Sequence, residues 1–476
     1  MIPILSGNVA SATASTGYTI DNSCRFNDDD TAYLSRTQTS GDATKFTYSG
    51  WMKRCLLTDA IDFLDIYDDN SNRFGFFWSY IDCIDMYNKT GGPLTFQKIT
   101  TAKFRDVSAW YHVVIAADSS LGVAEDRVKL WVNGVRITSF GTNTNISQDA
   151  SFSIHTSDDT QKIGAYGVSG SDYDGYMAEV FWIDGTAYDQ DDFGEFSEDS
   201  PNIWMPKDCK DDLTFGTNGF YLDFKDSADL GADVSGNSND FTVTNLDATN
   251  QSTDTPTNNF CTWNSLDTYY SSATFAEGNT TVVTPNGSIT YATGTIGLSS
   301  GRWYFEVQPY DPSDDNSIGI VDHVSTSNSS SAGELHYQPR GWCYRQTGDA
   351  YNNNSSLTGS WSSYSAGVTI GVFLDLEDNK IYWSRDGVMQ NSGTGISITA
   401  AASTDTGFYF PAVGDYNGSD DTTFRTNFGG SSSFAISSAV TDDNGYGNFE
   451  YTPSVTVDST AKKFYAICTK NLAEYG

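Results

Sequence analysis

The chain has 476 residues and a formal net charge of −35, because 61 Asp and Glu outnumber 26 Lys and Arg. This length favours two or three domains over a single one. Basic residues gather no further than pairs such as Lys53-Arg54 and Lys462-Lys463, so we expect no nucleic-acid partner. No apolar stretch is long enough to span a bilayer and no secretory signal opens the chain. We therefore predict no membrane insertion and synthesis in a cytoplasm.

The residue pattern is typical of strands. Aromatic residues make up 14% of the chain, and Leu, Ala, Glu and Lys do not recur at helical spacing over three turns. Two aromatic and β-branched runs, 129–135 and 380–388, contain Asn133-Gly134 and Asp386-Gly387. These dipeptides favour the type I′ turn of a β-hairpin. We predict an all-β protein with two antiparallel β-sandwiches.

The N-terminal part comprises a short arm and a first sandwich. Residues 1–19 are small and polar after Met-Ile-Pro-Ile-Leu, and we interpret them as a docking arm. Residues 46–53 alternate so that Phe46, Tyr48, Gly50 and Met52 share one strand face, with Trp51 on the other. Further strands are expected at 60–67, 73–80, 110–116, 127–132 and 175–183.

Four of these segments, 46–51, 110–113, 128–135 and 174–180, resemble in order the strand motifs of concanavalin A-like, laminin G-like lectin domains. The resemblance implies a jelly-roll of two antiparallel sheets over residues 20–198.

A linker rich in Asp, Asn, Ser and Thr follows at 199–264. Residues 219–224 predict one strand in it, and we expect the segment to pack onto the first sandwich.

The second sandwich is predicted at 265–435. Its segments 300–307, 317–321, 368–375 and 424–429, together with the hairpin at 380–388, resemble the SPRY domain in order. That family is an interaction module, which implies binding rather than catalysis. The remaining residues, 436–476, carry a mixed apolar pattern and are expected to cover an edge strand.

Catalytic signatures are scarce. The four histidines lack metal-binding spacing, and no Gly-x-Ser-x-Gly elbow or phosphate-binding loop occurs. Glycoside hydrolysis would need two carboxylates on one side of a cleft. Glu179 and Asp184 are an odd number of residues apart, so a regular strand points them to opposite faces. We predict that the chain is not an enzyme, and keep polysaccharide degradation as a third alternative.

Calcium is the one cofactor that the sequence suggests. Acidic loops offer hard oxygen ligands, and by resemblance to laminin G-like lectins Asp172 and Asp174 are the candidate calcium ligands. The alternative is that these residues serve as ordinary turn formers.

Aromatic residues in polar surroundings are the candidate ligand-binding residues. Trp342 and Tyr344 lie in one such segment, and Trp361 and Tyr364 in another. Exposed aromatic rings suit sugar faces and peptide anchors. Alternatively, the same rings alternate into the core as strand residues.

The order of the two domains resembles proteins of tailed bacteriophages that infect marine bacteria. That resemblance implies a virion surface protein, made in the host cytoplasm and bound to other virion proteins. We expect a tail-fibre adhesin that binds host-surface carbohydrate, as a homo-oligomer that multiplies weak sites. The alternative is a capsid decoration or head-fibre protein that binds other virion proteins.

Overall fold

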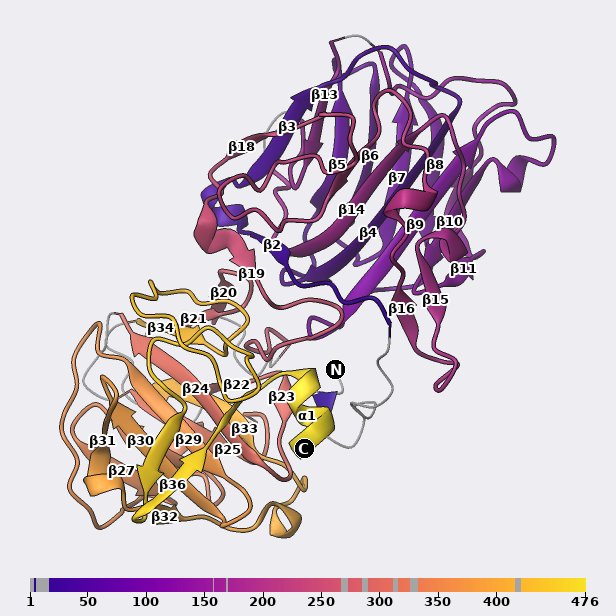
Figure 1. The fold of residues 1–476 in the computed structure, drawn as a ribbon. Helices are drawn as coiled ribbons and strands as arrows, with labels where there is room; N and C mark the ends of the chain where they lie inside the picture. Colours follow the sequence, from indigo (N-terminus) through magenta and orange to yellow (C-terminus); the bar gives the residue numbers. More distant parts are fainter. Residues whose placement is uncertain are drawn as a thin grey trace. The chain divides into compact units, whose positions relative to one another are not determined.

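The computed structural model describes residues 4–5, 17–156, 158–167, 170–266, 273–284, 290–310, 316–325, 333–415 and 421–476. The chain divides into two compact units, one of residues 14–257 and one of residues 258–476 together with the N-terminal strand β1 (Ile4–Leu5). The prediction of an all-β protein is confirmed, since the described part has a single α-helix, α1 (Thr469–Tyr475) (Figure 1). No helix in these ranges is long and apolar enough to cross a membrane.

The first unit is a sandwich of two antiparallel eight-stranded sheets. The first sheet has the order β11-β10-β9-β4-β14-β2-β19 with β17 added to β14, and the second has the order β12-β8-β7-β6-β5-β13-β3-β18. We call them the β14 sheet and the β5 sheet. The strands of the β14 sheet are β2 (Ser23–Phe26), β4 (Lys45–Arg54), β9 (Trp110–Asp118), β10 (Val128–Val132), β11 (Val135–Ile137), β14 (Gly175–Asp184), β17 (Phe220–Leu222) and β19 (Gln251–Ser252). Those of the β5 sheet are β3 (Tyr33–Thr37), β5 (Ile61–Tyr67), β6 (Arg73–Trp78), β7 (Ile84–Lys89), β8 (Leu94–Thr100), β12 (Phe140–Thr144), β13 (Thr160–Ile163) and β18 (Thr242–Thr244).

The core of the first unit lies between these sheets and is strongly aromatic. As the alternation in β4 predicts, Phe46, Tyr48 and Met52 belong to this core, while Trp51 packs in a separate cluster on the outer face. The ring of Phe46 stacks on Trp182 of β14 at 5.0 Å between centroids. Burial of such large rings is the main favourable contribution to the stability of the sandwich.

The segment predicted as a linker is divided between the two units. Residues 199–257 supply β17, β18 and β19 to both sheets of the first unit, so the expected strand at 219–224 is confirmed as β17. They also supply β16 (Trp204–Pro206), which pairs with β15 (Gly194–Phe196). Residues 258–264 belong to the second unit, where Phe260 bridges Cys468 and Trp263 bridges Gly294.

The second unit is also a sandwich of two sheets, in which every described strand pairing but one is antiparallel. One sheet has the order β20-β21-β34-β24-β29-β30-β31, with β32 on β30 and β37 on β24, and the other has the order β22-β33-β25-β26-β27-β28. The strands are β20 (Thr274–Ala276), β21 (Thr281–Thr284), β22 (Thr290–Thr293), β24 (Arg302–Pro309), β25 (Ser317–Val321), β26 (Trp342–Arg345), β27 (Asp349–Asn352), β28 (Ser355–Ser356), β29 (Ile370–Asp375), β30 (Lys380–Arg385), β31 (Val388–Met389), β32 (Ile396–Ser397), β33 (Phe410–Asp415), β34 (Thr422–Asn427) and β37 (Tyr465–Ala466).

Both predicted hairpin turns are present. Asn133 and Gly134 have φ angles of 48° and 75°, and Asp386 and Gly387 have φ angles of 46° and 75°. Two consecutive positive φ angles are what a type I′ turn requires. The turns join β10 to β11 and β30 to β31.

The C-terminal segment covers a sheet face instead of an edge strand. The outward rings of Tyr304, Phe373 and Tyr382 form a cluster with Phe449 and Phe464 from this segment. The cluster includes Val457 of the hairpin formed by β35 (Ser454–Val457) and β36 (Thr460–Lys463). The expectation was an edge cover, whereas these contacts lie on a sheet face, where they shield large aromatic side chains from water.

The predicted docking arm lies mostly outside the described residues. Within it, β1 pairs in parallel with β23 (Ile296–Gly297) of the second unit. At its other end, Tyr18 is packed against an outer cluster of the first unit. The described parts of the arm are therefore held by the chain itself.

Candidate ligand-binding site

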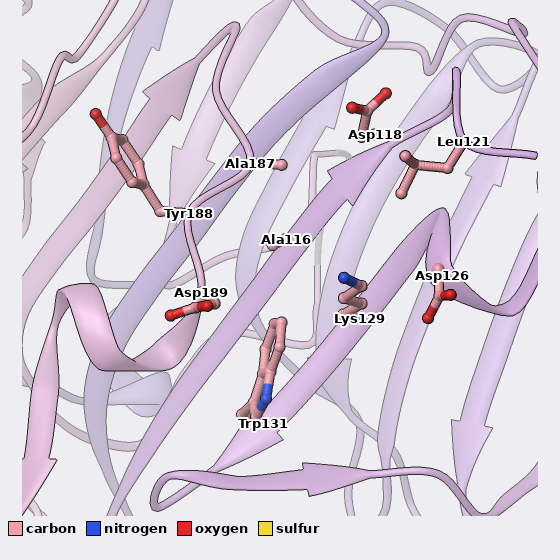
Figure 2. Close-up of a pocket in the computed structure, with 9 residues that line it drawn as sticks. All are labelled: Ala116, Asp118, Leu121, Asp126, Lys129, Trp131, Ala187, Tyr188 and Asp189. Atoms are coloured by element: carbon pink, nitrogen blue, oxygen red, sulfur yellow. The ribbon is translucent and has the colours of Figure 1, made fainter. Parts of the chain in front are cut away.

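A pocket of about 110 Å³ lies on the outer face of the β14 sheet (Figure 2). Its lining combines carboxylates, one ammonium group, two aromatic rings and small apolar side chains. The lining residues are Ala116, Asp118, Leu121, Asp126, Lys129, Trp131, Ala187, Tyr188 and Asp189.

Strand pairing positions the floor of this pocket. Ala116 of β9 lies directly opposite Lys129 of β10, so both side chains leave the same face of the sheet. Trp131 is two residues further along β10 and shares that face, while Leu130 between them points into the core. The segment after β14, which carries Tyr188, supplies the remaining wall (Figure 2).

Two of the three carboxylates are already paired. Asp118 accepts hydrogen bonds from Ser120 and forms an ion pair with Lys45 at 3.3 Å. Burial acts to raise the pKa of Asp118, but these bonds outweigh it and the pKa lies below its usual value. Asp126 forms an ion pair with Arg136 at 3.1 Å. Both groups are therefore fixed acceptors on the pocket wall.

Lys129 and Asp189 differ from these paired groups. In the described structure Lys129 forms no ion pair with any of the three carboxylates of the pocket, and Asp189 forms none with a basic side chain. Asp189 accepts a hydrogen bond from the backbone N–H of Asp191. An ammonium donor and a carboxylate acceptor thus face one pocket without neutralising each other.

The two aromatic rings of the pocket are held in place. Trp131 is buried, with the guanidinium of Arg136 5.6 Å from the centre of its ring. The Tyr188 hydroxyl accepts a hydrogen bond from the Thr214 N–H at 2.9 Å. Hydrogen-bonding groups of both kinds beside small apolar side chains can hold a small polyhydroxylated molecule by hydroxyl contacts.

Three of the four predicted binding aromatics are core residues. Trp342, Tyr344 and Tyr364 have exposed fractions of 4%, 0% and 4%. Tyr364 packs on Tyr344 and donates a hydrogen bond to Asn316 at 2.8 Å. The expectation that these rings form an open surface does not fit their burial, because core contacts already occupy their faces.

Trp361 is the partly exposed member of the predicted set. Its ring lies edge-on to Trp383 at 5.6 Å and packs against the core from outside. The surrounding loop is held by Asn391, whose side chain accepts a hydrogen bond from the Ser360 N–H at 3.1 Å.

The predicted calcium ligands lie beside a buried tyrosine. Asp172 is half-buried, Asp174 is 2% exposed, and Tyr173 between them belongs to the core. The Asp174 carbonyl accepts a hydrogen bond from the Cys55 N–H at 3.1 Å. Within the residues that the structure describes, no group of three or more His, Cys, Asp or Glu side chains could hold a metal ion.

The pocket was not predicted from the sequence. A signal was present, because Lys129 and Trp131 occupy alternate positions of a strand whose other positions are apolar. Nothing in the sequence indicates that residues 187–189, some 60 positions later, return to the same face.

Comparison with family models gives two matches. Residues 27–190 match the concanavalin A-like lectin/glucanases superfamily, and residues 302–430 match the SPRY domain. The chain therefore carries a concanavalin A-like domain followed by a SPRY domain, as the sequence motifs predict. A comparison with curated proteins gives no match.

Several solved structures are similar to parts of the chain. The SPRY domain of human HERC1 is 17% identical, with a TM-score of 0.25, over 31% of this chain and 86% of that chain. The heptameric SAP-like pentraxin from Limulus polyphemus is 14% identical, with a TM-score of 0.28, over 36% of this chain and 78% of that chain. The TRIM65 PSpry domain is 14% identical, with a TM-score of 0.27, over 34% of this chain and 88% of that chain.

Concanavalin A-like and SPRY domains are typically non-catalytic modules that bind protein or carbohydrate. The chain contains one domain of each kind.

Proposed function

We propose that the chain is a non-catalytic adhesin whose concanavalin A-like domain binds carbohydrate in the pocket around Lys129. A pyranose ring offers hydroxyl groups to the charged side chains of the pocket, and an apolar face to its small apolar side chains such as Ala116 and Ala187. The observation that carries this proposal is the ammonium of Lys129, which forms no ion pair with the pocket carboxylates in the described structure, in the same pocket as the carboxylate of Asp189. Neighbouring hydroxyls of one sugar can accept from the first and donate to the second.

A panel of immobilised saccharides tests the carbohydrate proposal. We expect the intact chain to bind at least one neutral pyranoside, with weak affinity for each single site. The absence of binding across neutral, acidic and amino sugars would contradict it. Release of reducing sugar from a bound polysaccharide would instead support the enzymatic alternative.

We further propose, from the resemblance of the domain order to proteins of tailed bacteriophages, that the adhesin stands on a virion surface, where several copies act together. Several copies would compensate for weak single sites, because linked sites gain avidity by high effective concentration. Sedimentation equilibrium of the purified chain is expected to show a homo-oligomer, and a monomer at all concentrations would count against multivalent display by the chain alone.

Electron microscopy of intact particles, labelled with gold-conjugated antibody against the chain, locates it on the virion. Gold at the tail supports the adhesin. Gold over the capsid would favour the alternative of a decoration or head-fibre protein that binds other virion proteins. Particles without label would contradict both assignments.

A further inference from the structure

The outer face of the β5 sheet carries an aromatic ring between two carboxyl groups. Asp62 of β5 lies directly opposite Phe77 of β6, and Phe77 lies directly opposite Asp85 of β7. Residues opposite each other on neighbouring antiparallel strands share a face of the sheet. This face is the outer one, because the chain neighbours of all three residues belong to the core: Ile61, Phe63, Phe76, Trp78, Ile84 and Met86.

Asp62 is buried on this face without a counter-charge. The residue is 2% exposed, and its Oδ1 forms no hydrogen bond in the described structure. No ion pair among the described residues includes it. Burying a carboxyl group without a partner is costly, so the position points to a positively charged group that the chain itself does not supply.

Asp85 is in a similar position on the other side of Phe77. It is 5% exposed, and its two carboxylate oxygens accept hydrogen bonds from the Gln97 amide at 3.2 and 3.1 Å. It too forms no ion pair within the described residues. Burial raises the pKa of Asp62 well above its usual value, with the nearby Asp65 adding to the rise, and burial raises the pKa of Asp85 to about 6.

Asp65 shows by contrast a satisfied carboxylate on the same face. It accepts hydrogen bonds from Arg73 Nε at 2.9 Å, from the Tyr87 hydroxyl at 3.1 Å and from the Gly167 N–H at 3.0 Å. Arg73 also acts on Asp62 electrostatically, but its ion pair is with Asp65. The chain therefore supplies a paired cation for one of these three acids and leaves the two beside Phe77 without one.

We propose that Asp62, Phe77 and Asp85 form a binding site for a guanidinium group, supplied by an arginine side chain of a partner protein. The ring of Phe77 is only half-buried, so part of it is open to a ligand. A guanidinium is planar and weakly hydrated, and it stacks on an aromatic ring while its N–H groups donate to carboxylates. An ammonium group is more strongly hydrated and lacks this planar arrangement of donors.

A metal ion fits this site less well. Among the residues that the structure describes, no group of three or more His, Cys, Asp or Glu side chains could hold one. The site is also independent of the carbohydrate proposal, because the pocket around Lys129 lies on the other sheet of the first unit.

Ligand-observed NMR of short peptides with the intact chain tests the guanidinium site. Acetyl-Gly-Arg-Gly-amide and its citrulline counterpart have nearly the same shape, but only the arginine peptide is positively charged. At pH 8, above the pKa of Asp85, we expect the arginine peptide to bind at least about tenfold more tightly. Equal affinity of the two peptides, or no binding of either, would overturn the proposal. A lysine peptide that binds as tightly as the arginine peptide would overturn it as well.

Two variants locate the binding. Asp62→Asn keeps the shape of the side chain and removes its charge, so we expect the affinity for the arginine peptide to fall at least about tenfold. Asp85→Asn is expected to cause a similar loss, and it provides the test if Asp62→Asn does not fold. Asp226→Asn, the same change at an exposed position of the first unit, is the matched control and should bind as the native chain does. Undiminished binding by a folded Asp62→Asn variant would overturn the proposal.

Discussion

His112 shows how burial determines the protonation state of a single side chain in this protein. Its ring is stacked on Trp51 at 4.6 Å between centroids. The Trp204 Nε1–H donates to Nδ1 at 2.9 Å, so the proton of the neutral imidazole is on Nε2, which lies 2.9 Å from the Ser49 hydroxyl. Burial lowers the pKa of His112 from 6.5 to about 3, so the ring is a neutral structural residue.

Acid should therefore destabilise the first unit through His112. The pKa of His112 is lower in the folded state than in the unfolded state. The stability that the neutral ring contributes is therefore present above pH 6.5 and is lost as the pH falls toward 3. Between pH 6 and pH 5 we expect about 1 kcal/mol of unfolding free energy to disappear. Denaturant titrations of the native chain and His112→Gln measure this, and equal losses in the two proteins would contradict the assignment.

Measuring stability and binding on the same variants shows which of the predicted binding aromatics are core residues. Tyr364→Ala should cost about 3–5 kcal/mol, because it empties a buried core position. Trp361→Ala should cost clearly less, because its ring lies at the surface of the core. Thermal unfolding measures both changes. A stable Tyr364→Ala variant that has lost binding to cells would show that Tyr364 acts in recognition after all.

At the residue level, the regular alternation of side chains along a strand was enough to predict which of them face the core. The faces of β4 and both hairpin turns followed from local residues alone. The burial of the predicted binding aromatics could not be predicted in this way, because Trp342 and Tyr344 lie on a short strand in polar surroundings. The sequence also gave no signal for the bulge in β14 at Glu179, since a bulge depends on how two distant strands pair.

At the scale of elements, the acidic segment after residue 198 is a structural part of the sandwich. Asp254 lies near its end and is 2% exposed. It accepts hydrogen bonds from Lys53 at 2.7 Å and from the Trp110 indole at 3.1 Å. A composition rich in Asp and Asn suggested a linker, but these residues form turns between added strands and one of them forms a buried ion pair.

Loss of this ion pair should be costly. We expect Asp254→Ala to destabilise the first unit by about 3–5 kcal/mol, because the ammonium of Lys53 remains buried without its carboxylate. Asp21→Ala, at an exposed position, is the control and should change stability by less than about 0.5 kcal/mol. Chemical denaturation followed by tryptophan fluorescence compares them, and similar small losses would contradict a structural role for the segment.

The C-terminal segment illustrates the same limit of prediction. Glu306 on β24 accepts the backbone N–H groups of Glu450 and Tyr451 at 3.0 and 2.8 Å. A buried carboxylate that binds two backbone donors fixes where the segment crosses the sheet. Sequence patterns predicted an added element here, but which surface it covers depends on contacts between residues 144 and 145 positions apart.

At the scale of the whole molecule, the order of the two domains could be predicted and the boundary between them could not. The motifs that resemble the two families lie inside the sandwiches, and family models match the same regions. The boundary at residue 257 depends on β18 and β19, which complete the sheets of the first unit through pairings with strands over 200 residues earlier. The carbohydrate proposal likewise depends on a pocket assembled from distant segments.

The most direct test of the carbohydrate proposal compares sugar binding by three proteins on the same saccharide panel. Lys129→Ala removes the ammonium of the pocket, and Lys103→Ala makes the same change of charge at an exposed position outside the pocket. A hydrogen bond to a charged group contributes about 1.5–3 kcal/mol, so we expect Lys129→Ala to weaken binding at least about tenfold. Lys103→Ala should bind as the native chain does. Undiminished binding by a folded Lys129→Ala variant would contradict the pocket as the carbohydrate site.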